Sequence, residues 1–126
     1  MEFSPTPEQS RIRDAIEKIC ARFDADYWLA KDKEGGFPHD FHRAFAEAGW
    51  LGICIPEDFG GAGLGVTEAA VMMQAVAQSG AGLSGASALH MNIFGLNPVV
   101  VFGAEQDMLQ QRPQVRIVFN QQYAAH

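Results

Sequence analysis

Histidines are the side chains in this sequence best suited to binding a metal or moving a proton near neutral pH. His39 and His42 stand three residues apart, a spacing that places two imidazoles on one face of a helix. A zinc site needs three or four protein ligands, and the sequence offers no evident third ligand for this pair. We therefore interpret both as solvated surface histidines. His90 differs, because it lies within the apolar run 89–94, where a lone histidine is typical of a core or pocket position.

A glycine-rich segment at residues 60–65, with the sequence GGAGLG, suggests a second kind of chemistry. Glycines ahead of a helix N-terminus let backbone amides approach a phosphate group. The spacing departs from the G-x-G-x-x-G pattern, however, and no lysine follows it as in a phosphate-binding loop. A tight turn that requires positive φ angles explains these glycines better. The alternative is a helical nucleotide-binding protein, which would lose nucleotide binding on Gly63→Val.

Acid–base and nucleophilic catalysis need side chains that their surroundings activate. Glu57 and Asp58 enter a constrained loop beside Pro56, where we expect them to cap or fix the turn. No serine or cysteine has an evident base and orienting partner. The pair Met72 and Met73 is typical of a helix core rather than of cofactor contacts. The residues by themselves therefore indicate no catalytic residue and no metal ligand.

Length and composition narrow the classes of protein further. The 126 residues suffice for one domain, and the 48% of hydrophobic residues can form its core. A net charge of -6 argues against nucleic acid and anionic membrane surfaces as partners. The two cysteines are far apart, and no apolar run approaches the roughly 20 residues of a membrane-spanning helix. Without an evident leader, the sequence predicts a cytoplasmic protein that does not insert into membranes.

Apolar residues recur at intervals of three and four along most of the chain, which predicts an all-α fold. Thr6, Pro7 and Gln9 form a helix start, with Gln9 completing a capping box. Helices are expected at about 7–29, 37–49, 68–79 (capped by Thr67), 84–94 and, as a short one, 97–103. Glycines at positions 80 and 82 should break the chain between the third and fourth of these helices.

The last part of the chain does not follow the helical pattern. Val115, Ile117 and Phe119 alternate with Arg116, Val118 and Asn120, as in a strand. A lone strand has no partner in a helical domain. We expect this tail to be poorly ordered or docked on the domain.

Residues 37–106 carry a longer pattern that resembles a known family. Phe37-Pro38 is followed by AGWLGI at 48–53 and by IPEDFGGAGLG at 55–65. SALHM at 87–91 and FGAEQ at 102–106 come next, in the same order as in that family. Together with the first helix, residues 5–106 resemble the amino-terminal domain of acyl-CoA dehydrogenases.

The resemblance implies an up-and-down helical domain of about four to six helices. It also implies FAD-dependent α,β-dehydrogenation of an acyl-CoA thioester in a homo-oligomer, with electrons passing to an electron-transfer flavoprotein. In that family the glutamate base and most flavin contacts belong to other domains, so neither is carried onto a residue here. The acyl-chain pocket takes part of its wall from this domain, at the positions that match His90, Met91 and Phe94.

After Gln106 the sequence departs from the family pattern. We therefore divide the chain into a helical domain at 1–106 and a divergent tail at 107–126, and interpret the tail as a frameshift, a truncation or a designed end. The chain alone is then expected to be inactive and to self-associate through uncovered apolar faces. The alternative function is a non-catalytic helical binding or interaction module.

Overall fold

The computed structural model describes residues 4–98 and 102–103. This part of the chain contains helices and no strand, so the predicted all-α class is confirmed. The α-helices are α1 (Pro7–Cys20), α2 (Ala25–Glu34), α3 (His39–Glu47), α4 (Val66–Val76) and α5 (Gly82–His90). Two 3-10 turns, η1 (Trp50–Gly52) and η2 (Glu57–Phe59), and two π-type segments, η3 (Ala77–Ala81) and η4 (Met91–Leu96), complete the order. Across these described residues, we find no helix with the length and apolar character that crossing a bilayer requires.

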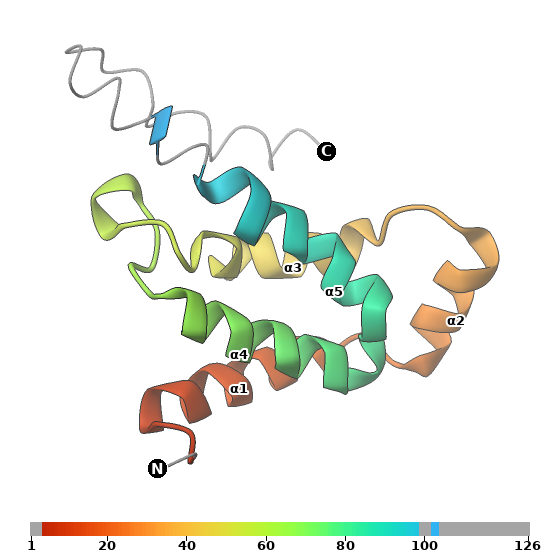
Figure 1. The fold of residues 1–126 in the computed structure, drawn as a ribbon. Coiled ribbons are helices and arrows are strands. Elements are labelled where there is room, and N and C mark those ends of the chain that lie inside the picture. Colours follow the sequence, from red (N-terminus) through yellow and green to blue (C-terminus); the bar gives the residue numbers. More distant parts are fainter. Residues whose placement is uncertain (1–3, 99–101, 104–126) are drawn as a thin grey trace.

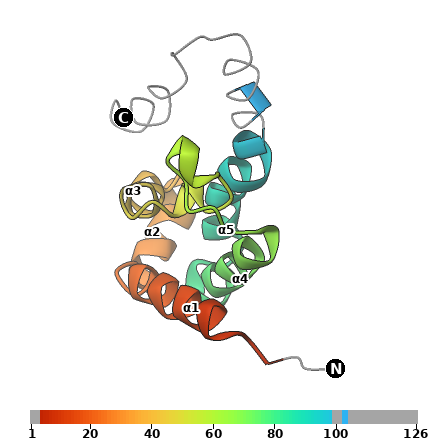
Figure 2. The same cartoon turned by 90° about the vertical axis from the view of Figure 1, so that its left-hand side faces the viewer.

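Four of the α-helices form two layers. α1 lies along α4, and α3 lies beside α5 on the other side of the core (Figure 1). In the view of Figure 2, α1 and α4 again lie in one half of the molecule and α3 and α5 in the other. α2 projects at one end of the molecule and buries no residue fully (Figure 1). The predicted helix 7–29 is therefore wrong in one respect, because the chain turns away after α1 and starts a new helix.

Asp24 is the physical reason for that turn. Its backbone is extended, and its side chain accepts a hydrogen bond of 3.0 Å from the Tyr27 N–H, which starts α2 with an N-cap.

At the start of α1, by contrast, the predicted capping box is confirmed. The Gln9 N–H donates to Thr6 Oγ1, and the Thr6 N–H donates to Gln9 Oε1, both at 3.1 Å.

The predicted start of the third helix is also wrong. α4 begins at Val66, so Thr67 lies inside the helix and is not its cap. The Gly65 N–H donates instead to Glu68 Oε2 at 3.2 Å, which satisfies an amide ahead of the helix. The predicted break is confirmed, since Gly80 and Gly82 both have positive φ angles, of 90° and 53°.

α5 begins close to the predicted position but changes character at its end. From Met91 the backbone continues as the π-type segment η4, which the sequence pattern did not indicate. The predicted short helix at 97–103 lies partly outside the described residues, and the predicted strand-like tail lies outside them entirely.

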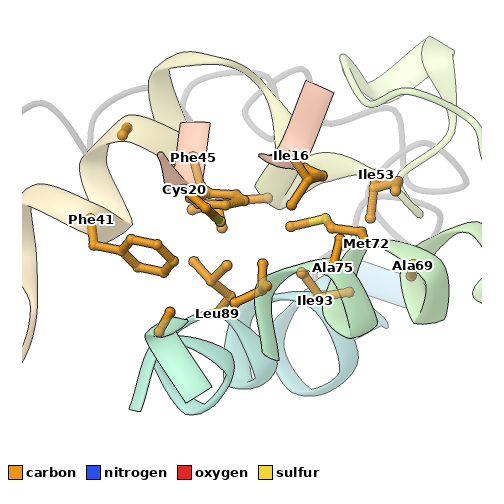
Figure 3. Close-up of a cluster of buried hydrophobic side chains, with 14 of the residues drawn as sticks. Ile16, Cys20, Phe41, Phe45, Ile53, Ala69, Met72, Ala75, Leu89 and Ile93 are labelled. Carbon is orange, nitrogen blue, oxygen red and sulfur yellow. The ribbon is translucent and has the colours of Figure 1, made fainter. Parts of the chain in front are cut away.

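The core lies between the two helix layers, as Figure 3 shows. Ile16 from α1, Met72 from α4 and Leu89 from α5 are each 0% exposed. Phe41 and Phe45 of α3 are also fully buried, and the Phe41 ring contacts Phe23 and Trp28 in edge-to-face geometry. Met72 is thus a core residue, as predicted. This core fixes α5 and η4 against α3, which sets the surface that η4 presents.

Candidate functional site

The glycine-rich loop is a closed network of backbone hydrogen bonds. The Ala62 N–H donates to Gly52 O, the Gly63 N–H to Ile55 O and the Leu64 N–H to Ile53 O, at 2.8–3.1 Å. The Gly60 N–H donates to Glu57 O, the Gly61 N–H to Pro56 O and the Gly65 N–H to Glu68 Oε2. Every amide from 60 to 65 is therefore used within the chain. A phosphate cradle needs such amides free, so the nucleotide-binding alternative has no donors in this loop.

The glycines of the loop are needed for its shape. Gly60 and Gly63 have φ angles of 84° and 66°, which confirms the prediction of a tight turn with positive φ. A Cβ atom on Gly61 would overlap the carbonyl group and Cβ of Ile55. Glu57 and Asp58 lie in η2 at the entry to this turn, where both side chains are exposed.

The two histidines of α3 have different surroundings. His39 is exposed, as predicted, but His42 is half-buried, so its prediction as a solvated surface residue is wrong. His42 Nε2 lies 2.9 Å from Asn92 Nδ2 of η4, and the His42 ring packs beside Phe37 at 5.3 Å between centroids. Burial lowers the pKa of His42, and the charge of His39 lowers it further. Within the described residues, no three His, Cys, Asp or Glu side chains gather as metal ligands.

The cysteines are unsuited to nucleophilic chemistry. Burial raises the pKa of the Cys20 thiol against an opposing hydrogen bond with Ser79, and Glu17 raises it slightly. Burial likewise raises the pKa of Cys54, whose Sγ lies 3.5 Å from Gly65 O, and the nearby Glu68 adds to this. A raised thiol pKa leaves less of the reactive thiolate at neutral pH.

His90, Met91 and Phe94 lie together where α5 passes into η4. The His90 ring packs against the Phe94 ring at 5.4 Å between centroids. His90 is exposed, Met91 is 67% exposed and Phe94 is half-buried against the core. His90 is therefore not a core residue, and its place in a pocket stays a prediction. The His90 and Phe94 rings are in contact, and Met91 is exposed between them in the sequence, so we treat the three as one candidate surface.

Two asparagines behind this surface are residues that the sequence reasoning missed. Asn92 contacts His42 as described above, and Asn97 is only 2% exposed. Asn97 Nδ2 donates to Leu51 O at 2.6 Å, which joins the end of η4 to η1. The sequence signal was an asparagine on an otherwise apolar helix face, because a buried amide there needs partners from elsewhere in the fold.

The family resemblance also implies FAD, whose pyrophosphate needs several hydrogen-bond donors. The glycine-rich loop is the segment that would supply backbone donors, and its amides are already paired. This loop therefore does not fit the phosphates of a flavin dinucleotide. None of the described residues is assigned to a flavin.

The sequence matches the family described as "Acyl-CoA dehydrogenase, N-terminal domain" over residues 6–112. Benzylmalonyl-CoA dehydrogenase of Aromatoleum aromaticum is 34% identical over 89 residues, which cover 71% of this chain and 24% of that protein. Probable acyl-CoA dehydrogenase YngJ of Bacillus subtilis is 30% identical over 108 residues, covering 84% of this chain and 28% of the relative. Probable acyl-CoA dehydrogenase YdiO of Escherichia coli is 39% identical over 62 residues, covering 48% and 16% respectively.

The chain thus spans about a quarter of the length of the first two of these relatives. No solved structure gives a significant match. The family match extends over most of the chain and over all five α-helices. This chain therefore belongs to the acyl-CoA dehydrogenase family and carries its amino-terminal helical domain.

Proposed function

We propose that this domain serves an FAD-dependent acyl-CoA dehydrogenase, which oxidises the α,β carbon–carbon bond of an acyl-CoA thioester. Its part in that enzyme is to supply one wall of the acyl-chain pocket and surfaces for packing against other domains or subunits. The observation that carries the proposal is the surface of His90, Met91 and Phe94 at the junction of α5 and η4. Family membership supports the reaction, and this surface supports the role of the domain in it.

The chemistry of the surface suits an acyl chain. Met91 exposes 67% of its surface, and burying an apolar side chain of this size against a ligand is worth about 1.5–3 kcal/mol. A thioether is flexible and polarisable, so it adapts to chains of different shape. The Phe94 ring packs partly against the core, which restricts its motion.

His90 adds a polar group to this wall. Its ring packs against Phe94 in a tilted arrangement and stays accessible, so it can donate or accept a hydrogen bond at the edge of the apolar surface. We propose that these three side chains close the far end of the pocket. Their bulk then limits chain length or favours an acyl group that is branched or polar.

The test uses a full-length dehydrogenase that carries this domain. Met91→Ala, Phe94→Ala and the double variant should raise kcat/KM for long straight-chain acyl-CoA thioesters relative to short ones, because truncation opens space. Leu83→Ala is the matched control, since Leu83 is 84% exposed on α5 two turns before Met91. A chain-length profile that Met91→Ala and Phe94→Ala leave unchanged would contradict the pocket assignment.

For the 126-residue chain by itself, we propose that it neither holds FAD nor oxidises acyl-CoA thioesters. The loop that could bind the dinucleotide has no free amide between residues 60 and 65. The purified chain should be colourless, with no flavin absorbance and no reduction of an electron-transfer flavoprotein on adding acyl-CoA. Stoichiometric flavin together with turnover would overturn this part of the proposal.

A second candidate function is a helical interaction module, which the exposed apolar side chains favour. The large ones among the described residues are Leu29, Phe37, Val66, Leu83, Met91 and Phe102. Exposed apolar side chains promote association where they gather into a contiguous patch. Sedimentation velocity should show species larger than a monomer as concentration rises, and the double variant Leu83→Gln/Met91→Gln should reduce them. A wild-type chain that stays monomeric throughout would exclude self-association.

A further inference from the structure

The segment η4, which carries Met91 and Phe94, is connected to α3 and η1 by two side-chain contacts. Asn92 Nδ2 contacts His42 Nε2 of α3 at 2.9 Å, near the start of η4. Asn97 Nδ2 donates to Leu51 O of η1 at 2.6 Å, directly after η4 ends. Both contacts join residues more than 40 positions apart, so they are products of the tertiary fold.

These two contacts are relevant to function because η4 is a π-type segment. Such segments are rare and often occur at functional sites. Asn92 follows Met91 directly and precedes Phe94 by two residues, yet it faces α3 while Met91 faces solvent. The rotation of this turn about its axis is therefore coupled to where the Asn92 amide is held.

We propose that His42 is a positioning residue, which through the Asn92 amide sets the orientation of Met91 and Phe94 and so tunes acyl selectivity. The selectivity part rests on the proposed function, while the positioning part concerns this chain alone.

The contact between Asn92 and His42 depends on the protonation state of the imidazole. An asparagine Nδ2 only donates, so this arrangement requires His42 Nε2 as acceptor, which the neutral imidazole with its proton on Nδ1 provides. When His42 is protonated, both ring nitrogens donate, and the Asn92 amide must rotate to present its oxygen. Among the groups that face His42 are the Phe37 ring before α3, the His39 imidazole on α3 and the Asn92 amide on η4. Of these, only His39 carries a charge on protonation, and that charge opposes protonation of His42.

The test on the 126-residue chain follows the Met91 methyl group, labelled with 13C, and the Phe94 ring by NMR while pH is varied. Their resonances should shift with the same midpoint as the His42 ring. Asn92→Asp places a carboxylate beside the imidazole and should move that shared midpoint to higher pH. His42→Ala should abolish the shared transition and displace the Met91 resonance at every pH, and His42→Gln should return it toward wild type.

His39→Gln is the matched control. It removes the exposed neighbouring imidazole, so the midpoint should rise while the size of the Met91 shift stays the same. The positioning role is overturned if the His42 ring titrates visibly while the Met91 and Phe94 resonances do not shift with it. It is also overturned if Asn92→Asp leaves the midpoint of their shifts unchanged. Should His42→Ala fail to fold, Asn92→Asp decides alone, because it keeps a side chain of the same size.

Selectivity in a full-length enzyme separates this inference from the proposed function. His42→Ala should change the ratio of kcat/KM between long and short acyl-CoA thioesters, and His42→Gln should restore it. If Met91→Ala and Phe94→Ala change the chain-length profile of kcat/KM and His42→Ala does not, the positioning role of His42 is contradicted. The pocket assignment is then still supported. If Met91 and Phe94 shift with His42 by NMR, but neither Met91→Ala nor Phe94→Ala changes the chain-length profile of kcat/KM, the pocket assignment is contradicted. The positioning role of His42 is then still supported.

Discussion

Gly61→Ala is the substitution that most directly tests the packing of the glycine-rich loop. Gly61 packs against the backbone of Ile55, and an added Cβ would overlap the carbonyl group and Cβ of that residue. Backbone atoms cannot move aside as the end of a flexible side chain can. The loop must therefore separate from the segment 52–56, on which its hydrogen bonds depend.

The magnitude follows from the contacts that this separation breaks. The new Cβ would lie 2.5 Å from the Ile55 carbonyl carbon, about 1 Å inside the ~3.5 Å of an ordinary carbon–carbon contact. Overpacking of this kind costs about 1–3 kcal/mol. The bonds from the amides of Ala62, Gly63 and Leu64 cross the same gap, and losing one or two adds about 1 kcal/mol each. We expect a loss of about 2–5 kcal/mol, a large part of the ~5–15 kcal/mol that stabilises a typical domain.

Urea denaturation followed by far-UV circular dichroism measures this loss. Gly52→Ala is the control, because its Cβ would meet its nearest atoms at 3.6 and 3.8 Å, which is ordinary contact. We expect Gly52→Ala to change the free energy of unfolding by less than about 1 kcal/mol. If Gly61→Ala destabilises the chain no more than Gly52→Ala does, the argument for a backbone-packed loop is refuted.

Three further predictions concern the core, the loop cap and pH. Phe41→Ala should lower the free energy of unfolding by about 3–5 kcal/mol, since the ring is 0% exposed and contacts three aromatic neighbours; a loss below about 1 kcal/mol in urea denaturation would contradict this. Glu68→Ala should cost about 0.5–2 kcal/mol by removing the acceptor of the Gly65 N–H, whereas Glu68→Gln should retain most of that stability in the same assay. The folded state lowers the pKa of His42, so the unfolded chain binds more protons and stability should fall as pH drops through the ordinary value of 6.5. His42→Gln should flatten that fall in thermal melts across this range, and an unchanged slope would argue against a buried, neutral His42.

The features of the fold that the sequence predicted well are those that depend on neighbouring residues. The capping box of Thr6 and Gln9 needs only one turn of helix, and the break near Gly80 needs only a positive φ angle. The division between α1 and α2 was missed because the apolar spacing continues from Ile16 through Phe23 to Tyr27 across the Asp24 cap. A short polar cap can thus override a periodic pattern when tertiary contacts support the turn.

The candidate site likewise contains residues that the sequence indicated and residues that it did not. The positions of His90, Met91 and Phe94 came from the family resemblance, and their role in an acyl pocket stays a prediction. The half-burial of His42 and the contacts of Asn92 and Asn97 could not be predicted, because each depends on a residue that lies 46 or 50 positions away. Only the packing of α3 and η1 against η4 brings these groups together.

The glycine-rich loop shows why a glycine pattern by itself does not indicate a phosphate site. What decides the function of such a loop is where its amides donate, and here all of those from 60 to 65 donate within the chain. The last of them, Gly65, donates to Glu68, whose other carboxylate oxygen lies 3.5 Å from Gln9 Nε2. Because Gln9 also completes the cap of α1, the starts of α1 and α4 are joined through two capping side chains. The loop therefore links the start of α4 to the start of α1, in addition to the core contacts that pack these two helices together.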